Sequence, residues 1–241
     1  EAAAKSAQTA LELAPRDPQI HLDLGYYKLW AYRDVDGAVA EFETAAEGLA
    51  GSAEIFNALK NVYVIQGEWE KALDALQRGI ELSPRDADLV SGSAWALIML
   101  RRYPEALAAS DQAISLVPDA FWPYFYKALN FWCWHGDPSE TRSVFEALQA
   151  SAGGWERWSW YWQEMYEGRY REALTRLEST TDGWIKIKMY ARPNVMLAAY
   201  VYERLGEKDA AALAFEQARR VLEAEVDRTP EDPRLRSSLG I

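Results

Sequence analysis

An interval of 34 residues constrains the fold of this 241-residue chain more than any other feature of its sequence. Pro84 and Pro118 are separated by one such interval, and residues 53–86 align with residues 87–120 without a gap. The same interval separates small, aromatic and leucine positions: Ala38, Ala72 and Ala106; Trp69 and Tyr103; Leu82 and Leu116. Self-similarity at a fixed interval of this length is typical of proteins that stack one small unit many times. We therefore expect an elongated array.

The order of residues within each window resembles the tetratricopeptide repeat. That family places an aromatic residue, Leu-Gly and Tyr on a first helix, then Ala, Phe and Pro on a second helix. The window 53–86 carries, in order, Phe56, Leu59, Tyr63, Gly67, Trp69, Ala72, Leu76, Gly79 and Pro84. The resemblance implies an all-α fold: an α-solenoid of tandem helix-turn-helix repeats that forms a superhelix with a concave groove.

Extended along the chain, the pattern predicts a single array over residues 1–241 that stops inside a unit at both ends. An array that stops inside a unit exposes an apolar face, so we expect this chain to be a segment of a longer polypeptide. The predicted parts are a partial repeat with only a second helix (1–17), repeats at 18–52, 53–86, 87–120, 121–153 and 154–181, an insertion (182–191), a repeat with a long second helix (192–230) and the start of a further repeat (231–241).

Small residues recur where the two helices of a pair are expected to cross closely, with larger side chains filling the space beside them. These positions are Ala38, Ala72, Ala106, Ala173 and Ala211. Within 121–153, Asp137 and Pro138 fit the N-cap and the first residue of the second helix. The sequence therefore predicts both the buried crossings and one helix boundary.

Tryptophan is unusually frequent, with 11 residues in the chain, and 7 of them fall between residues 122 and 162. The family resemblance implies a groove lined by the first helix of each unit, and helical spacing adds Tyr166 to the stripe on 154–166. The predicted groove residues are Asn57, Asn61, Trp95, Trp122, Phe125, Trp132, Trp155, Trp158, Trp162 and Tyr166. The alternative that these rings pack between units stays open, and Trp158 in particular fits a core position if the unit is shifted by one residue.

Charge and the scarcity of metal-binding residues exclude several classes of partner. The chain has 26 Lys and Arg against 37 Asp and Glu, a net charge of −11, which argues against nucleic acid. The excess of acidic over basic residues is concentrated in the first 120 residues, which hold 10 basic and 19 acidic side chains. A partner steered by charge should therefore prefer that half. One cysteine, Cys133, and two histidines predict no disulfide, no metal site and no cofactor. No apolar run is long enough for membrane insertion.

Motifs for catalysis are also missing, because the sequence holds no phosphate-binding glycine loop, His-Glu-x-x-His or Gly-x-Ser-x-Gly. We expect a non-catalytic, cytoplasmic scaffold that binds a protein or peptide in the aromatic groove, including segments with proline or with an arginine that stacks on tryptophan. One alternative is a regulatory or oligomerisation arm of a larger bacterial signalling protein (a cyclase, kinase or transcription regulator), whose arrays residues 24–34 and 211–223 loosely resemble. Carbohydrate binding on stacked tryptophans and self-association through exposed array ends are further alternatives.

Overall fold

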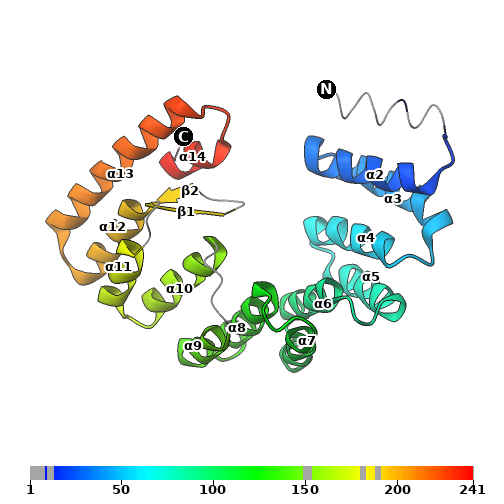
Figure 1. The fold of residues 1–241 in the computed structure, drawn as a ribbon, viewed down its shortest axis with the longest axis horizontal. Helices are drawn as coiled ribbons and strands as arrows, with labels where there is room; N and C mark the ends of the chain where they lie inside the picture. The colour runs from blue at the N-terminus through cyan, green and yellow to red at the C-terminus, as the bar shows by residue number, and fades with distance from the viewer. Residues whose placement is uncertain (1–8, 10–13, 149–153, 180–182, 188–190, 241) are drawn as a thin grey trace. The chain divides into compact units, whose positions relative to one another are not determined.

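The computed structural model describes residues 9, 14–148, 154–179, 183–187 and 191–240. In these residues the chain is an all-α solenoid, in which helices follow one another in tandem and pack on their sequence neighbours (Figure 1). The predicted fold class is therefore confirmed. The partial repeat predicted at 1–17 lies largely outside the described residues.

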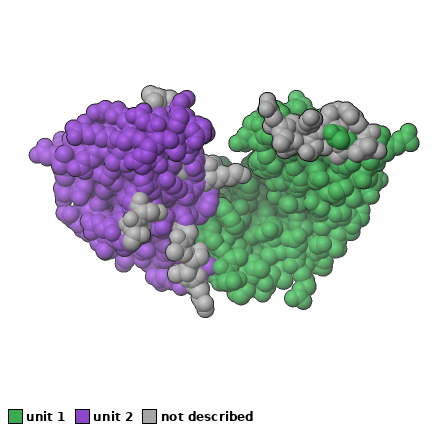
Figure 2. All heavy atoms as spheres, turned by 45° about the horizontal axis from the view of Figure 1, so that its top comes forward, with its two compact units in different colours: residues 1–136 green, residues 137–241 purple. Residues whose placement is uncertain are grey.

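The chain divides into two compact units, residues 1–136 and residues 137–241, coloured green and purple in Figure 2. The division falls between Gly136 and Asp137, inside the repeat predicted at 121–153. The repeat boundaries of the sequence analysis and the compact units of the structure are thus different divisions of the same chain.

Unit 1 is built from consecutive helix pairs, α2 with α3, α4 with α5 and α6 with α7, followed by α8, which packs on α6 and α7. The bounds are α2 Pro18–Tyr27, the π-helical turn η1 Lys28–Tyr32, α3 Val35–Leu49, α4 Ala53–Gln66, α5 Trp69–Leu82, α6 Ala87–Met99, α7 Tyr103–Leu116 and α8 Phe121–His135.

Unit 2 continues with helix pairs but also contains a short β-hairpin that packs against α10, α12, α13 and α14. The bounds are α9 Pro138–Ala147, α10 Gly154–Tyr166, α11 Tyr170–Glu178, β1 Trp184–Lys186, β2 Ala191–Pro193, α12 Asn194–Leu205, α13 Lys208–Arg228 and α14 Pro233–Leu239.

Local sequence accounts for where the helices begin and end. The Asp86 carboxylate accepts hydrogen bonds from the first backbone N–H groups of α6, and Asp137 does the same for α9, whose first residue is Pro138. The predicted cap at Asp137 and Pro138 is confirmed. Helices α4 and α8 end at Gly67 and Gly136, which adopt φ values of 74° and 69° that a residue with a Cβ rarely tolerates.

The helix crossings are buried as the repeat predicts. A Cβ on Gly25 would lie 2.3 Å from Phe42 Cε1, so this pair of helices approaches as closely as glycine permits. The five predicted crossing positions Ala38, Ala72, Ala106, Ala173 and Ala211 are all buried. The small alanine side chains let the two helices approach closely, and the larger side chains beside them fill the remaining space.

The unit predicted at 18–52 holds one extra residue before its second helix, and the structure absorbs it in a π-helical turn. Helix α2 runs into η1, the chain then reverses at Arg33 with φ 58°, and Asp34 caps α3. An i→i+5 turn is the usual way in which a helix accommodates one inserted residue.

The insertion at 182–191, for which the sequence predicted no structure, contributes one strand of the hairpin. β1 pairs antiparallel with β2, with Ile185 opposite Arg192. The hairpin is fastened to α14, since Arg234 Nη1 donates to the Ile187 carbonyl at 3.0 Å and Ser238 Oγ donates to the Ala191 carbonyl at 3.0 Å. Among the described residues of the insertion, Ile185, Ile187 and Ala191 are buried in unit 2.

Candidate functional site

Aromatic rings on α5, α6 and α8 form a continuous row in unit 1. Trp69 meets Trp95 edge to face at a centroid distance of 5.4 Å, and Trp95 stacks on Tyr126 at 6.1 Å with an interplanar angle of 6°. Tyr126 in turn stacks on Trp122 at 5.9 Å, and Trp122 meets Phe125 edge to face at 5.7 Å. We call these five residues the aromatic row. It brings together three predicted groove residues, Trp95, Trp122 and Phe125.

Trp122 on α8 is the exposed member of the aromatic row. Trp95 and Phe125 are half-buried, whereas Trp122 is 39% exposed. A large aromatic surface left open on a folded chain is a common feature of interaction sites, because its burial by a partner is favourable. Trp122 is therefore the member of the row best placed to meet a ligand.

Charged groups from α4 and α6 lie near the aromatic row. Asp88, the second residue of α6, is exposed. Burial raises the pKa of the Tyr126 hydroxyl to about 12, and the negative charge of Asp88 contributes to the increase. Burial lowers the pKa of the Lys60 ammonium, while Asp88 and Asp86 act in the opposite direction. Asp88 thus lies within electrostatic reach of both a ring of the row and a lysine.

The predicted polar pair Asn57 and Asn61 lies on α4, and both side chains are half-buried. The Oδ1 atom of Asn61 accepts a hydrogen bond from Lys60 Nζ at 2.9 Å. One amide of the pair is therefore already engaged within the chain, while its NH₂ group keeps the capacity to donate. Trp132, also predicted, is half-buried near the end of α8.

In unit 2 the predicted aromatic face on α10 is partly core. Trp155, Trp158 and Trp162 are half-buried and pack against a cluster of buried residues that includes Ile185 and Ile187 of the hairpin segment. Part of the surface of each ring, including that of Trp158, is therefore packed within the protein, as the alternative to a groove position predicts. Nothing in the sequence indicated that Ile185 and Ile187 would pack into the same cluster as these rings.

The C-terminal end of the same face is open. Tyr166 is 62% exposed and its ring stacks on Trp162 at 5.7 Å. Beside them lies a pocket of about 370 Å³ between α10 and α12, lined by Trp162, Met165, Tyr200, Glu203 and Arg204. The walls are aromatic and thioether groups, and the charged groups belong to exposed side chains. Such a pocket accepts an apolar side chain and can pair with a charge at its rim.

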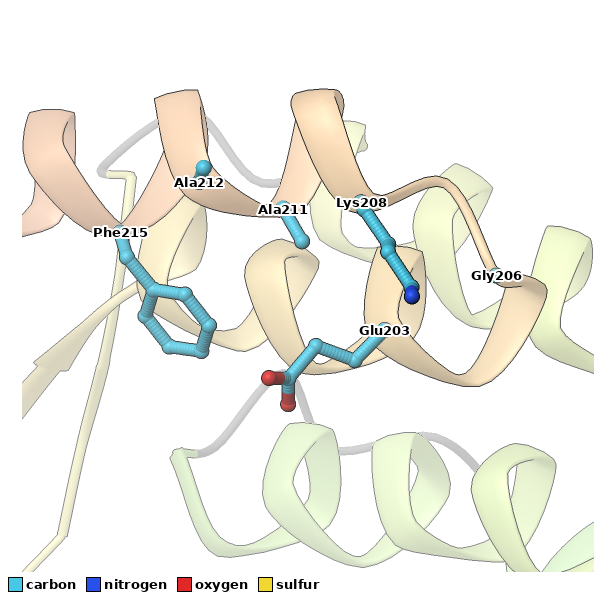
Figure 3. Close-up of a pocket in the computed structure, with 6 residues that line it drawn as sticks. All are labelled: Glu203, Gly206, Lys208, Ala211, Ala212 and Phe215. Atoms are coloured by element: carbon cyan, nitrogen blue, oxygen red, sulfur yellow. The ribbon is translucent and has the colours of Figure 1, made fainter.

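A second pocket, of about 430 Å³, adjoins the first because Glu203 lines both. Figure 3 shows the Glu203 and Phe215 side chains directed to the same side of α12 and α13. Its lining residues are Glu203, Gly206, Lys208, Ala211, Ala212 and Phe215. Sequence reasoning missed Tyr200, Glu203 and Arg204, although their spacing on a first helix follows helical periodicity and could have indicated them.

Sequence reasoning also missed a buried ionic cluster that joins α9, α10 and α11. Glu164 is 2% exposed and accepts hydrogen bonds from Arg142 Nη2 at 2.7 Å and from Arg176 Nη2 at 2.9 Å. Both guanidinium groups lie over the Trp160 ring, with Cζ at 5.5 Å and 4.6 Å from its centroid. Both oxygens of Glu164 are bonded within the chain, so the cluster holds the helices together and does not present an open site.

The described residues contain no group of three or more His, Cys, Asp or Glu side chains that could hold a metal ion. Within that same part of the chain, no helix has both the length and the apolar character needed to cross a membrane.

Residues 61–121 match the family model of the tetratricopeptide repeat. This segment of the chain consists of tetratricopeptide repeats. It runs from α4 to the start of α8 and contains the whole window 87–120 and most of the window 53–86. No curated protein sequence matches the chain.

Solved structures of tetratricopeptide-repeat proteins share the fold of this chain at low sequence identity. A tetratricopeptide repeat protein from Parabacteroides merdae has a TM-score of 0.68 and 16% identity, covering 98% of this chain and 89% of its own. PilF of Pseudomonas aeruginosa has a TM-score of 0.64 and 17% identity, covering 92% and 96% respectively. YrrB, a TPR protein with an unusual peptide-binding site, has a TM-score of 0.51 and 15% identity, covering 98% of each chain.

The tetratricopeptide repeats at 61–121 indicate a coarse functional class. Solenoids of this kind are generally non-catalytic and act as scaffolds for protein interactions, because stacked repeats present extended surfaces.

Proposed function

We propose that this protein is a non-catalytic scaffold that binds a protein or peptide through the aromatic faces of its first helices. The observation that carries the proposal is the pocket lined by Trp162, Met165 and Tyr200, with Glu203 and Arg204 at its rim. Rigid aromatic walls with charged groups beside them are typical of sites that anchor one side chain of a bound protein segment.

The ligand surface in this proposal comprises the open ends of the two aromatic faces. In unit 1 it includes the exposed part of the aromatic row, with Asn57, Asn61 and Trp132 as further contacts. In unit 2 it includes Trp162 and Tyr166, while Trp155 and Trp158 support the face from beneath. Attachment to a larger bacterial regulatory protein, a cytoplasmic location and self-association stay predictions from the sequence.

The first test is a selection from a random-peptide display library on the purified protein. We expect the wild type to enrich a shared motif that a Trp122→Ala/Trp162→Ala variant with the same circular dichroism does not enrich. No enrichment by the wild type, or the same motif with both proteins, would remove the aromatic faces from the binding function.

The second test measures the affinity of one selected peptide for single variants. Replacement of Trp162 by alanine should weaken binding by about 2 kcal/mol, or roughly 30-fold, because it removes one wall of the pocket. Trp162→Phe should retain most of the affinity, and Trp134→Ala serves as a control, since Trp134 is also exposed but lies outside the predicted set. Unfolding of Trp162→Ala together with normal binding by Trp162→Phe and Tyr166→Ala would assign the ring to the core.

A further inference from the structure

The chain itself shows how an extended segment packs against the aromatic face of α10. Ile185 and Ile187 of the hairpin segment are buried in one cluster, whereas Lys186 between them is exposed. Trp155 and Trp158 of α10 pack against that cluster. Successive side chains of an extended chain point to opposite faces, so only every second residue meets the helices. An extended segment on this face therefore places apolar side chains at positions i and i+2 and turns the residue between them toward solvent.

Arginine side chains hold the main chain of the same segment. Arg157 of α10 donates from Nη2 to the Trp184 carbonyl at 3.4 Å. Arg234 of α14 donates from Nη1 to the Ile187 carbonyl at 3.0 Å. Main-chain carbonyls need donors wherever a segment leaves a regular ladder of hydrogen bonds. A guanidinium group beside an extended chain supplies them, because it carries five N–H donors and no acceptor.

The open pocket between α10 and α12 continues this arrangement toward the end of α10. Its walls Trp162, Met165 and Tyr200 pack against the same buried cluster as the hairpin segment. In the part of the chain that the structure describes, no ion pair joins Glu203 or Arg204 to another side chain. Arg204 therefore offers at the pocket rim the same donor group that holds the hairpin segment.

The second pocket lies one pair of rings away from the first. Tyr200 of the first pocket meets Phe215 of the second edge to face, with ring centroids 5.3 Å apart. Phe215 and Lys208 both extend from α13 toward α12 (Figure 3). Side chains at i and i+2 of an extended chain are about 6.4–6.8 Å apart, so two of them reach both pockets across this pair of rings.

We propose that the two adjoining pockets bind an extended segment of a partner protein that carries apolar side chains two residues apart. One side chain enters the pocket between Trp162 and Tyr200, the other enters the pocket beside Phe215, and the residue between them faces solvent. Arg204 donates to a main-chain carbonyl of the segment, as two arginines do for the hairpin segment. This inference rests on the proposed binding function and adds the conformation of the ligand and the spacing of its apolar residues.

The test uses the full chain and three labelled peptides of equal length and identical composition, each with two isoleucines in a background of serine and threonine. The isoleucines are adjacent in the first peptide, two residues apart in the second and three apart in the third. We expect the second peptide to bind more tightly than the others by about tenfold or more, because only its isoleucines lie on one face at the right distance. Equal affinity for the three peptides would overturn the proposal. So would tighter binding of an alanine-rich helical peptide with isoleucines four residues apart.

A variant that fills the second pocket tests whether both pockets are used. Ala212 is an exposed wall residue of that pocket, and Ala212→Phe should lower the affinity for the second peptide to that of a peptide with a single isoleucine. Leu213→Phe is the matched control, since Leu213 is 61% exposed and lies outside the lining of both pockets. Equal effects of the two variants, with unchanged circular dichroism, would overturn the use of the second pocket.

A second pair of variants tests the contact with the main chain. Arg204→Ala should weaken binding of the second peptide by about fivefold or more, because it removes the donor at the rim. Arg236→Ala, which removes an exposed arginine of α14, should leave the affinity unchanged. Equal losses from both variants would assign the effect to net charge and overturn the role of Arg204.

The outcomes also distinguish this inference from the function on which it rests. A library motif that is lost in Trp162→Ala but whose apolar residues are not two apart would leave the binding scaffold intact and refute the paired pockets. Absence of any enriched motif, together with absence of binding by all the peptides, would refute both.

Discussion

At the scale of single residues, the buried carboxylate of Glu164 in unit 2 requires partners that compensate for its loss of hydration. Its two oxygens accept from Arg142 and Arg176, and both guanidinium groups also lie over Trp160. Arg142 also donates hydrogen bonds to Glu167. Burial alone would raise the pKa of Glu167, but the hydrogen bonds from Arg142 and Gln163 hold this pKa below its ordinary value. One buried side chain thus coordinates residues from three helices.

Replacement of Glu164 by glutamine should destabilise the protein by about 2–3 kcal/mol, because Arg142 and Arg176 both lose the carboxylate with which they pair. The loss is limited because both arginines remain partly exposed to water. The measurement is urea unfolding followed by circular dichroism. Glu146→Gln is the matched control, since Glu146 lies 3.9 Å from the same Arg142 but is 60% exposed, and its loss should cost no more than about 0.5 kcal/mol. Equal losses from the two variants would show that the buried position has no special role.

At the scale of elements, a three-residue ionic contact joins α2 and η1 to α3. His21 Nδ1 lies 2.6 Å from Glu41 Oε2, its Nε2 lies 3.1 Å from the Pro15 carbonyl, and Lys28 Nζ donates to Glu41 Oε1 at 2.7 Å. Both partners of the imidazole are acceptors, so the contact favours the doubly protonated ring. The hydrogen bond with Glu41 raises the pKa of His21 above 6.5.

This contact makes the stability of the first helix pair depend on pH. The raised pKa of His21 contributes to the free energy of unfolding. This contribution is complete below the unfolded pKa of 6.5 and is lost as pH rises through the higher pKa of the folded state. Burial would raise the pKa of Glu41, but the hydrogen bonds from Lys28 and His21 lower it, so its own contribution is lost only as pH falls through that lowered value.

Proton NMR titration should therefore give a His21 pKa above 6.5 in the wild type and a lower value in Glu41→Gln. Thermal unfolding should show a fall in stability as pH rises above 6.5, and this fall should be smaller in Glu41→Gln. His135→Gln assigns the resonances without disturbing the contact. A wild-type His21 pKa at or below 6.5 would contradict the geometry.

At the scale of the whole molecule, the division into two compact units predicts that a destabilising substitution in one unit leaves the stability of the other unchanged. Stability in a solenoid is a sum of terms between neighbours, and Ile185 is 2% exposed within the interior of unit 2. We expect Ile185→Ala to lower amide hydrogen-exchange protection in α10 and α12 by about 2–4 kcal/mol of opening free energy.

The same variant should leave protection in α3 and α4 of unit 1 unchanged. Lys186→Ala, on the exposed side of β1, provides the control and should change little in either unit. Equal loss of protection in α3 and α10 would show that the chain unfolds as one cooperative body.

Much of the fold was predictable because the signals that determine it are local. The cap at Asp137 and the glycines that end α4 and α8 act through residues within a turn of themselves. The crossing alanines act between the two helices of one repeat, which are neighbours in sequence. The candidate site was less predictable. Helical spacing placed Trp122 and Trp162 on first helices, but the pocket beside Trp162 also needs Tyr200 and Glu203 from a helix beyond the insertion.

By itself, the sequence indicated a tandem array of helix pairs with aromatic first helices, because units that recur every 34 residues bury their apolar faces only against their neighbours. The motif residues within each window supplied the resemblance to the tetratricopeptide repeat. The tertiary structure alone decided which aromatic rings remain open. Trp158 lies under Arg192, 34 residues away along the chain, whereas Trp122 keeps an exposed face. Exposure depends on segments distant in sequence that come to pack on a ring, and periodicity carries no information about such contacts.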